Sequence, residues 1–156
     1  MDAQRADERF NQPCGLALDA EENLLVSDSG NHAIRRVTME GAVSTVADNG
    51  ETGSADGSGA DARFNGTCAL VIDGEGVIVV TDCDNQRLPK IVGGQVTTLA
   101  GSSEPSTADG TGTVAHCNQT YRLALDERGC LFAPTSVMCL RSPGSTTTVL
   151  STARCQ

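Results

Sequence analysis

Large aromatic side chains are scarce in this sequence. Among its 156 residues there is no Trp, one Tyr and three Phe, and aromatics make up 3% of the chain. Aromatic residues normally bring the largest apolar area to a core. The core must therefore be assembled from Val, Leu, Ile, Ala and Cys, within a chain whose length is that of one domain.

Basic residues are also few. Eleven Lys and Arg stand against twenty Asp and Glu, which gives a formal net charge of −9. Binding to a phosphate backbone needs clustered Lys and Arg, so the sequence argues against a nucleic-acid partner. The acidic surplus is explained most simply by solubility, and an acidic docking face is the alternative.

Long apolar runs are missing. No stretch of 18 apolar residues occurs, so the sequence predicts no transmembrane helix and no membrane partner. Residues 1–8 are charged and lack the apolar centre of a signal peptide. If Met1 is the true start, a cytoplasmic location follows.

The usual sequence signatures of metal and nucleophile chemistry are absent as well. The seven cysteines include no C-x-x-C pair, which argues against structural zinc. Cys14 and Cys68 occupy equivalent repeat positions, and we expect them to be small buried residues. A disulfide framework, the alternative, would leave one thiol unpaired. Ser27, Asp28 and His32 are close in sequence, but strand alternation separates neighbouring side chains, so no catalytic residue is predicted.

One segment occurs nearly three times. Its copies are Arg9–Asp19, Arg63–Asp73 and a degenerate third copy, His116–Asp126. Phe10 and the equivalent Phe64 are 54 residues apart. Each copy opens a set of four short β-rich runs separated by Gly, Asn and Asp, which is typical of a four-stranded antiparallel meander. The predicted strands are 14–18, 24–28, 33–37 and 42–47, then 68–72, 77–82, 87–91 and 96–100, then 121–125, 130–133, 137–141 and 146–150. Pro89 falls within a strand and requires an edge or a bulge.

The repeat divides the chain into four parts. We predict a flexible leader over 1–8 and a first unit with its connector over 9–62. A second unit with its connector covers 63–115, and a degenerate third unit with a tail covers 116–156. The connectors are long and rich in Gly and Asp, as expected of segments that span from the last strand of one unit to the first strand of the next.

The repeated residues resemble the NHL repeat. The motif Pro-x-Gly-Leu-Ala-Leu-Asp spans Pro13–Asp19, and Asn23–Val37 continues the pattern. The second unit keeps it over Val77–Arg87, and the connector Ala55–Asn65 is similar to those of long-loop NHL proteins. The resemblance covers about residues 9–150. It implies an all-β fold of β-propeller blades, here three four-stranded antiparallel blades forming a partial propeller or half of a six-bladed one.

The third unit departs from the family pattern. Thr120-x-Arg122 replaces Pro13-x-Gly15, and Thr135-x-x-Met138 replaces Asp28-x-x-Asn31. Three blades are also fewer than closed propellers use. The chain is thus a fragment of a longer propeller, an open half-propeller, or a subunit that associates with a copy of itself to complete one.

The turns Asp28-x-x-Asn31 and Asp82-x-x-Asn85 each close the second strand of a unit. Repetition favours a structural role as Asx turns. A functional role would place Asp28, Asn31, His32, Asp82 and Asn85 on one binding face.

Metal binding is a less favoured alternative. The connector carboxylates Asp48, Asp56 and Asp61 are Ca²⁺ candidates, because hard cations take oxygen ligands. They do not form the EF-hand pattern, so no cofactor is expected.

Function follows from sites rather than from the fold. We expect a non-enzymatic scaffold that binds a protein or peptide through its turn loops. The alternative is a fragment of a six-bladed, metal-dependent hydrolase or lyase resembling lactonases, which would need carboxylates, Asn or His converging from several blades. A non-functional remnant or a mis-cut gene is the third hypothesis.

Overall fold

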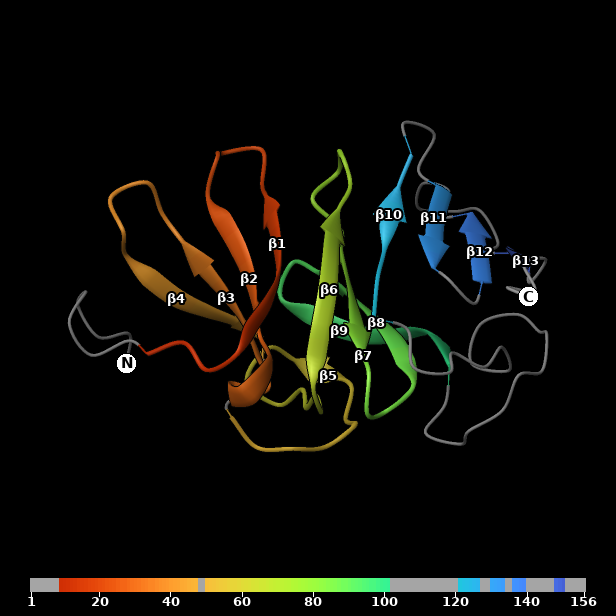
Figure 1. Ribbon diagram of the computed structural model, residues 1–156, viewed down its shortest axis with the longest axis horizontal. Coiled ribbons are helices and arrows are strands. Elements are labelled where there is room, and N and C mark those ends of the chain that lie inside the picture. Colours follow the sequence, from red (N-terminus) through yellow and green to blue (C-terminus); the bar gives the residue numbers. More distant parts are fainter. Residues whose placement is uncertain are drawn as a thin grey trace.

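A computed structural model describes residues 9–47, 50–101, 121–126, 130–133, 136–139 and 148–150. The described chain is all-β, and it forms three antiparallel sheets that follow one another along the sequence (Figure 1). This confirms the predicted fold class. Within these ranges no helix is long and apolar enough to cross a membrane.

The first sheet, called blade 1, is a simple meander. It consists of β1 (Pro13–Leu18), β2 (Leu24–Asp28), β3 (Ala33–Val37) and β4 (Val43–Ala47), hydrogen-bonded in that order. A short 3₁₀ turn, η1 (Ser29–Asn31), joins β2 to β3. All four strands lie where the alternating sequence pattern predicts them.

The second sheet, blade 2, repeats this meander and adds one strand. Its main strands are β6 (Thr67–Ile72), β7 (Ile78–Asp82), β8 (Arg87–Val92) and β9 (Gln95–Gly101). The connector contributes β5 (Gly57–Ser58), which pairs with the outer edge of β9 and was not predicted. The strand register shifts between Leu88 and Pro89, which is the bulge that the proline requires.

The third sheet, blade 3, has the same order of strands. They are β10 (Ala124–Leu125), β11 (Cys130–Ala133), β12 (Ser136–Cys139) and β13 (Thr148–Leu150). The predicted four slots are filled, but the strands are shorter than in blades 1 and 2. In Figure 1 the three blades stand side by side, with β1, β6 and β10 as their first strands.

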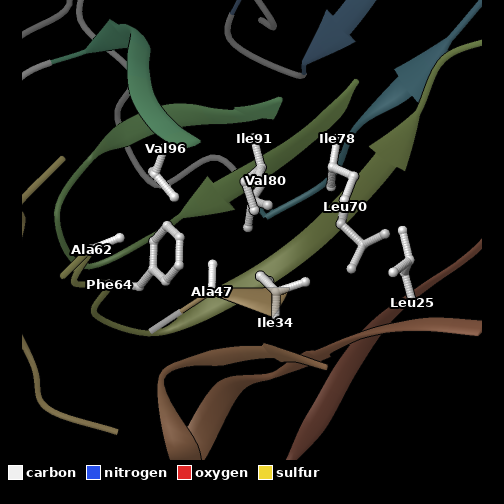
Figure 2. Close-up of a cluster of buried hydrophobic side chains, with 10 residues drawn as sticks. All are labelled: Leu25, Ile34, Ala47, Ala62, Phe64, Leu70, Ile78, Val80, Ile91 and Val96. Carbon is white, nitrogen blue, oxygen red and sulfur yellow. The ribbon is translucent and has the colours of Figure 1, made fainter. Parts of the chain in front are cut away.

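The core lies between the blades rather than within them. Blade 1 packs against blade 2 through Leu25, Ile34 and Ala47, which meet Phe64, Leu70, Ile78, Val80, Ile91 and Val96 with Ala62 (Figure 2). The opposite face of blade 2 uses Val79, Leu88, Leu99 and Ala100 and packs on Leu131 of blade 3. Aliphatic side chains supply nearly all of this core, as the composition predicts.

Two residues of the repeated segment differ between copies. Phe64 is fully buried, as expected of a packing residue between blades, whereas the equivalent Phe10 is exposed. Cys14 is likewise exposed and Cys68 is half-buried, so the expectation of two buried thiols is wrong for Cys14. Phe64 packs in the core between blades 1 and 2, whereas no described hydrophobic cluster includes Phe10.

Candidate functional site

The two Asp turns have the same geometry in blades 1 and 2. The Asp28 carboxylate accepts a hydrogen bond from the Asn11 backbone N–H at 2.7 Å and one from the Asn31 side-chain amide at 2.8 Å. Asp82 accepts equivalent bonds from Asn65 and Asn85 at the same distances. Both carboxylates are fully buried. Each therefore holds the start of its repeat against the turn that follows the second strand.

The asparagine side chains of these turns also donate hydrogen bonds to backbone carbonyls elsewhere in the chain. Asn31 Nδ2 donates to the Arg9 carbonyl at 3.0 Å, and Asn85 Nδ2 donates to the Gly53 carbonyl at 2.5 Å. Asn31 and Asn85 are half-buried. The structure thus brings each predicted Asp–Asn pair together as a turn clamp, and a ligand role for these turns stays a prediction.

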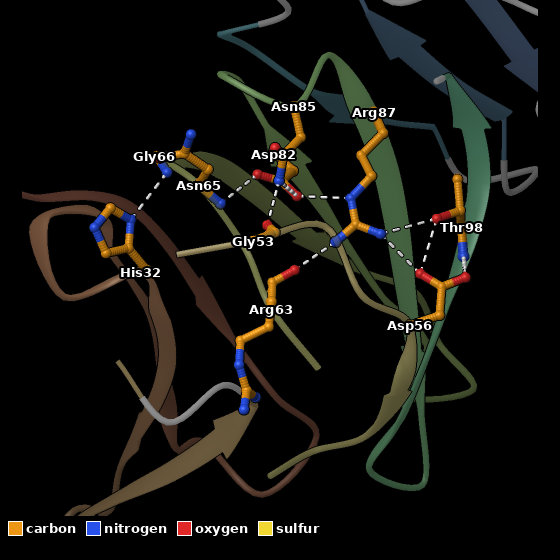
Figure 3. A network of polar contacts seen from close by, with 10 residues as sticks. All are labelled: His32, Gly53, Asp56, Arg63, Asn65, Gly66, Asp82, Asn85, Arg87 and Thr98. Atoms are coloured by element: carbon orange, nitrogen blue, oxygen red, sulfur yellow. Dashed lines mark hydrogen bonds and ion pairs between the residues drawn. The ribbon is translucent and has the colours of Figure 1, made fainter. Parts of the chain in front are cut away.

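His32 joins the two blades. It ends η1 in the left-handed conformation with φ of 56°, and its Nδ1 accepts a hydrogen bond from the Gly66 N–H at 3.3 Å (Figure 3). Ser27 is buried, and its hydroxyl has no hydrogen-bond partner. The histidine is therefore engaged with the neighbouring blade and is not hydrogen-bonded to Ser27.

A buried arginine, not foreseen from the sequence, organises the connector. Arg87 donates through Nε to Asp82 at 2.7 Å and through Nη1 to Asp56 at 2.7 Å (Figure 3). Its Nη2 donates to the Arg63 carbonyl at 2.5 Å, and its guanidinium carbon lies 5.9 Å from the centre of the Phe64 ring. Arg87 and Asp82 are direct cross-strand partners, and this opposite-charge pairing was the signal available in the sequence.

Burial raises the pKa of the Asp82 carboxyl, while the Asn85, Asn65 and Arg87 hydrogen bonds and the Arg87 charge oppose that rise. The guanidinium is almost completely buried with it. A buried charge pair needs this full set of hydrogen bonds to offset the cost of leaving water. The group is therefore a structural clamp between β7, β8 and the connector.

The connector carboxylates are engaged in the same way. Asp56 Oδ2 accepts from the Thr98 N–H at 2.7 Å, and Asp56 Oδ1 accepts from the Thr98 hydroxyl at 2.8 Å in addition to pairing with Arg87. Asp61 accepts a hydrogen bond from the Ser58 hydroxyl. Asp48 lies outside the described residues. Among the residues that are described, no group of three or more His, Cys, Asp or Glu side chains could hold a metal ion.

An open groove of about 530 Å³ lies at the opposite end of the blades, between the β1–β2 turn and the β6–β7 turn. We call it the inter-blade groove. Its apolar floor consists of Leu18, Leu25, Val46, Ile72 and Ile78, and its rim of Asp19, Ala20, Glu21, Arg36, Asp73, Gly74 and Gly76. Sequence reasoning missed it, because its two halves are 54 residues apart and only the packing of blade 1 on blade 2 joins them.

The rim of the inter-blade groove is acidic. Its arginine, Arg36, is paired through Nη2 with Asp19 at 2.8 Å and with Glu21 at 2.6 Å. Desolvation acts to raise the pKa of Asp19, but hydrogen bonds from Asn23 and Glu21 and the Arg36 charge outweigh it, and the pKa is lowered. Asp73 adds a third carboxylate, whose Oδ1 accepts two backbone N–H bonds. The rim thus carries three carboxylates and one arginine.

Comparison with solved structures shows where this fold occurs. A structural genomics protein of unknown function from Bacteroides thetaiotaomicron aligns with 76% of this chain at 23% identity and a TM-score of 0.71, over 31% of its own length. An auxiliary nutrient binding protein from Bacteroides ovatus aligns with 81% of this chain at 22% identity and a TM-score of 0.62, over 35% of its length. Virginiamycin B lyase from Staphylococcus aureus aligns with 99% of this chain at 8% identity and a TM-score of 0.60, over 45% of its length.

These structures are longer than this chain, which spans between 31% and 45% of them. Their likeness shows a shared propeller-like fold. No curated protein matches the sequence significantly. Residues 10–36, which comprise β1, β2 and most of β3, match the NHL repeat family. Residues 10–36 therefore carry an NHL repeat, within a chain built from propeller-like antiparallel blades.

Proposed function

We propose that the chain is a non-enzymatic propeller-type scaffold that binds a protein or peptide partner. The observation that carries this proposal is the inter-blade groove, with its apolar floor and acidic rim. The site would take an apolar side chain of the partner, with a Lys or Arg placed beside it. This moves the proposed binding face from the Asp28 and Asp82 turns to the other end of the blades.

The floor supplies the affinity in this proposal. Leu25 and Ile78 are buried in the inter-blade core and contribute apolar atoms to the lining of the groove. An inserted Leu or Phe side chain would lose contact with water there, which is worth roughly 1.5–3 kcal/mol for a fully buried side chain. A concave apolar site with a few polar groups at its edge is the usual form of a small binding site.

The rim supplies the selectivity. Arg36 is already paired with Asp19 and Glu21, so it does not offset the Asp73 carboxylate as well. The chain as a whole is acidic, with a formal charge of −9. Charge complementarity of this kind favours a basic partner and discourages an acidic one.

Binding is better supported than catalysis by the contacts described. The carboxylates of Asp28, Asp82 and Asp56, which are the best candidates for reactive groups, accept hydrogen bonds from their own chain. The name of the Bacteroides ovatus structure gives it a nutrient-binding role, and this supports ligand binding as a use of the fold.

The proposal can be tested by selecting peptides from a random 12-residue display library against the purified chain. We expect enrichment of peptides with Leu or Phe next to Lys or Arg, and weaker binding when that Lys or Arg is changed to Glu. Gly74→Trp should block binding at least tenfold, because Gly74 lines the groove and has open space around it. The matched control is Gln95→Trp, at an exposed position on β9 outside the groove. Enrichment of peptides without this pattern, or equal binding by the Gly74→Trp variant, contradicts the proposal.

A further inference from the structure

Blade 1 has an apolar face that is open to solvent. Phe10 is 39% exposed, Leu16 is 63% exposed and Leu18 is 61% exposed. We call these residues the blade 1 outer face. Leu16 and Leu18 alternate along β1 and therefore point to the same side of the sheet.

The repeat shows what normally covers this face. The equivalents of Phe10, Leu16 and Leu18 in blade 2 lie 54 residues later, at Phe64, Leu70 and Ile72. These three pack against blade 1, and Phe64 and Leu70 are buried there. The same positions are thus buried wherever a neighbouring sheet covers them, and the partner that fits is a sheet like the covering face of another blade.

The other end of the array offers such a covering face. Phe132 is 41% exposed, and Ala124 is exposed beside it on the paired strand. We call them the blade 3 outer face. In blade 2 the equivalent positions are Val79 and Val71, which pack against blade 3. The described residues therefore include two exposed apolar faces, and blades 1 and 2 show how faces of these two kinds fit together.

We propose that a second copy of this chain binds the blade 1 outer face with its blade 3 outer face, and that the two copies do so reciprocally. Virginiamycin B lyase matches 99% of this chain over 45% of its own length. Two copies would therefore supply about the length of one such structure. In such a dimer the two copies are related by one two-fold axis, and both outer faces of each copy are covered.

The contact between blades 1 and 2 gives this interface a distinctive feature. A Cβ placed on Gly15 would lie 2.4 Å from the Cys68 carbonyl oxygen, so the two first strands approach very closely. In blade 3 the equivalent position is Arg122, which is exposed. Its side chain holds the two first strands apart at the proposed interface. The dimer is therefore looser than the contact within the chain, and Arg122→Gly tightens it.

Charge also acts on this association. Each copy carries a formal charge of −9, so two copies repel each other at low ionic strength. Added salt screens this repulsion while the apolar contact persists. The dimer therefore strengthens as salt is raised.

The proposal is tested by sedimentation and light scattering of the full chain from 1 to 200 μM, at low and high salt. We expect a monomer–dimer equilibrium that shifts toward dimer with salt. Leu16→Asp should weaken dimerisation at least tenfold, and Arg122→Gly should strengthen it. Val92→Asp is the control, because Val92 is an exposed apolar residue at the end of β8 and away from both outer faces. Circular dichroism verifies that each variant folds.

The outcomes separate cleanly. A strict monomer at every concentration overturns the proposal, and so does a dimer that Leu16→Asp and Val92→Asp weaken equally. A ladder of open-ended oligomers would show that the faces meet without reciprocal closure, which also overturns it. Leu18 belongs to both the inter-blade groove and the blade 1 outer face, whereas Leu16 does not line the groove. The Leu16→Asp variant therefore tests dimerisation without changing the lining of the groove.

Discussion

At the scale of single residues, the turns of blades 1 and 2 share one device but differ in how it is completed. Asp28 and Asp82 make the same pair of bonds, to a backbone N–H and to an asparagine amide. Blade 2 adds Arg87, whose equivalent in blade 1 is Ala33. The arginine lets one buried group hold the connector, the turn and β8 together.

We expect Arg87→Met to destabilise the fold by about 3–5 kcal/mol, because removing one partner leaves Asp82 buried without its counter-charge. The matched variant is Arg36→Met, which breaks ion pairs at the exposed groove rim. Pairs of that kind contribute about 0–1 kcal/mol. Urea unfolding followed by circular dichroism measures both. Equal losses of unfolding free energy for the two variants would show that the buried Arg87 contacts stabilise the fold no more than the exposed Arg36 pairs do.

At the scale of strands and turns, the first strands of neighbouring blades are held at unusually short range. Gly15 on β1 faces the backbone of Cys68 and Ala69 on β6. A residue with a Cβ at this position must push the two strands apart. The glycine is therefore required by close packing between blades, whereas Gly74 lies in open space in the β6–β7 turn.

Gly15→Ala should accordingly destabilise the chain by about 1–3 kcal/mol through overpacking. Gly74→Ala has no neighbour within 4 Å to clash with, so we expect a change within about 0.5 kcal/mol, as is usual for surface substitutions. Thermal and urea unfolding of the two variants provide the comparison. A Gly15→Ala variant as stable as the parent would mean that β1 and β6 can move apart to accommodate the added methyl group at no cost in stability.

The strands themselves could be predicted from the sequence because their signal is local. Alternation and turn residues placed the four meander strands of blade 1 and of blade 2 within about two residues, and Pro89 correctly required a bulge. β5 was missed, because Gly57 and Ser58 have no strand-like pattern. Their pairing with β9 lies beside a long-range contact, in which Asp56 accepts a hydrogen bond from the Thr98 N–H across 42 residues.

The candidate site was less predictable for the same physical reason. The Asp–Asn pairs repeat at close spacing and were visible, but whether their carboxylates face solvent is decided by packing. The inter-blade groove joins the Asp19 turn to the Asp73 turn, and no local pattern marks two turns as neighbours. Exposure of Leu16 also depends on whether a sheet covers that side of β1, which single-sequence periodicity does not encode.

At the scale of the whole molecule, the described residues place the blades side by side, with blade 1 packed on blade 2 and blade 2 packed on blade 3. Within the described part of the chain, blade 2 is packed on both faces, whereas blade 1 is packed on one. In such arrays stability is close to a sum of the units and their interfaces. The middle blade should therefore open less often than the first.

Amide hydrogen exchange tests whether blade 2 opens less often than blade 1. The strands to compare are β2 and β7, because they are equivalent in the two blades and each pairs with a strand on either side. We expect amides of β7 to exchange at least tenfold more slowly than those of β2 in dilute solution, because opening β7 disrupts two interfaces and opening β2 disrupts one. Equal rates at low concentration would instead indicate that the array unfolds as one cooperative unit. If a second copy covers the blade 1 outer face, the β2 rate falls toward that of β7 as protein concentration rises. The Leu16→Asp variant keeps the gradient at every concentration, because it removes the dimer and leaves the contact between blades 1 and 2 in place.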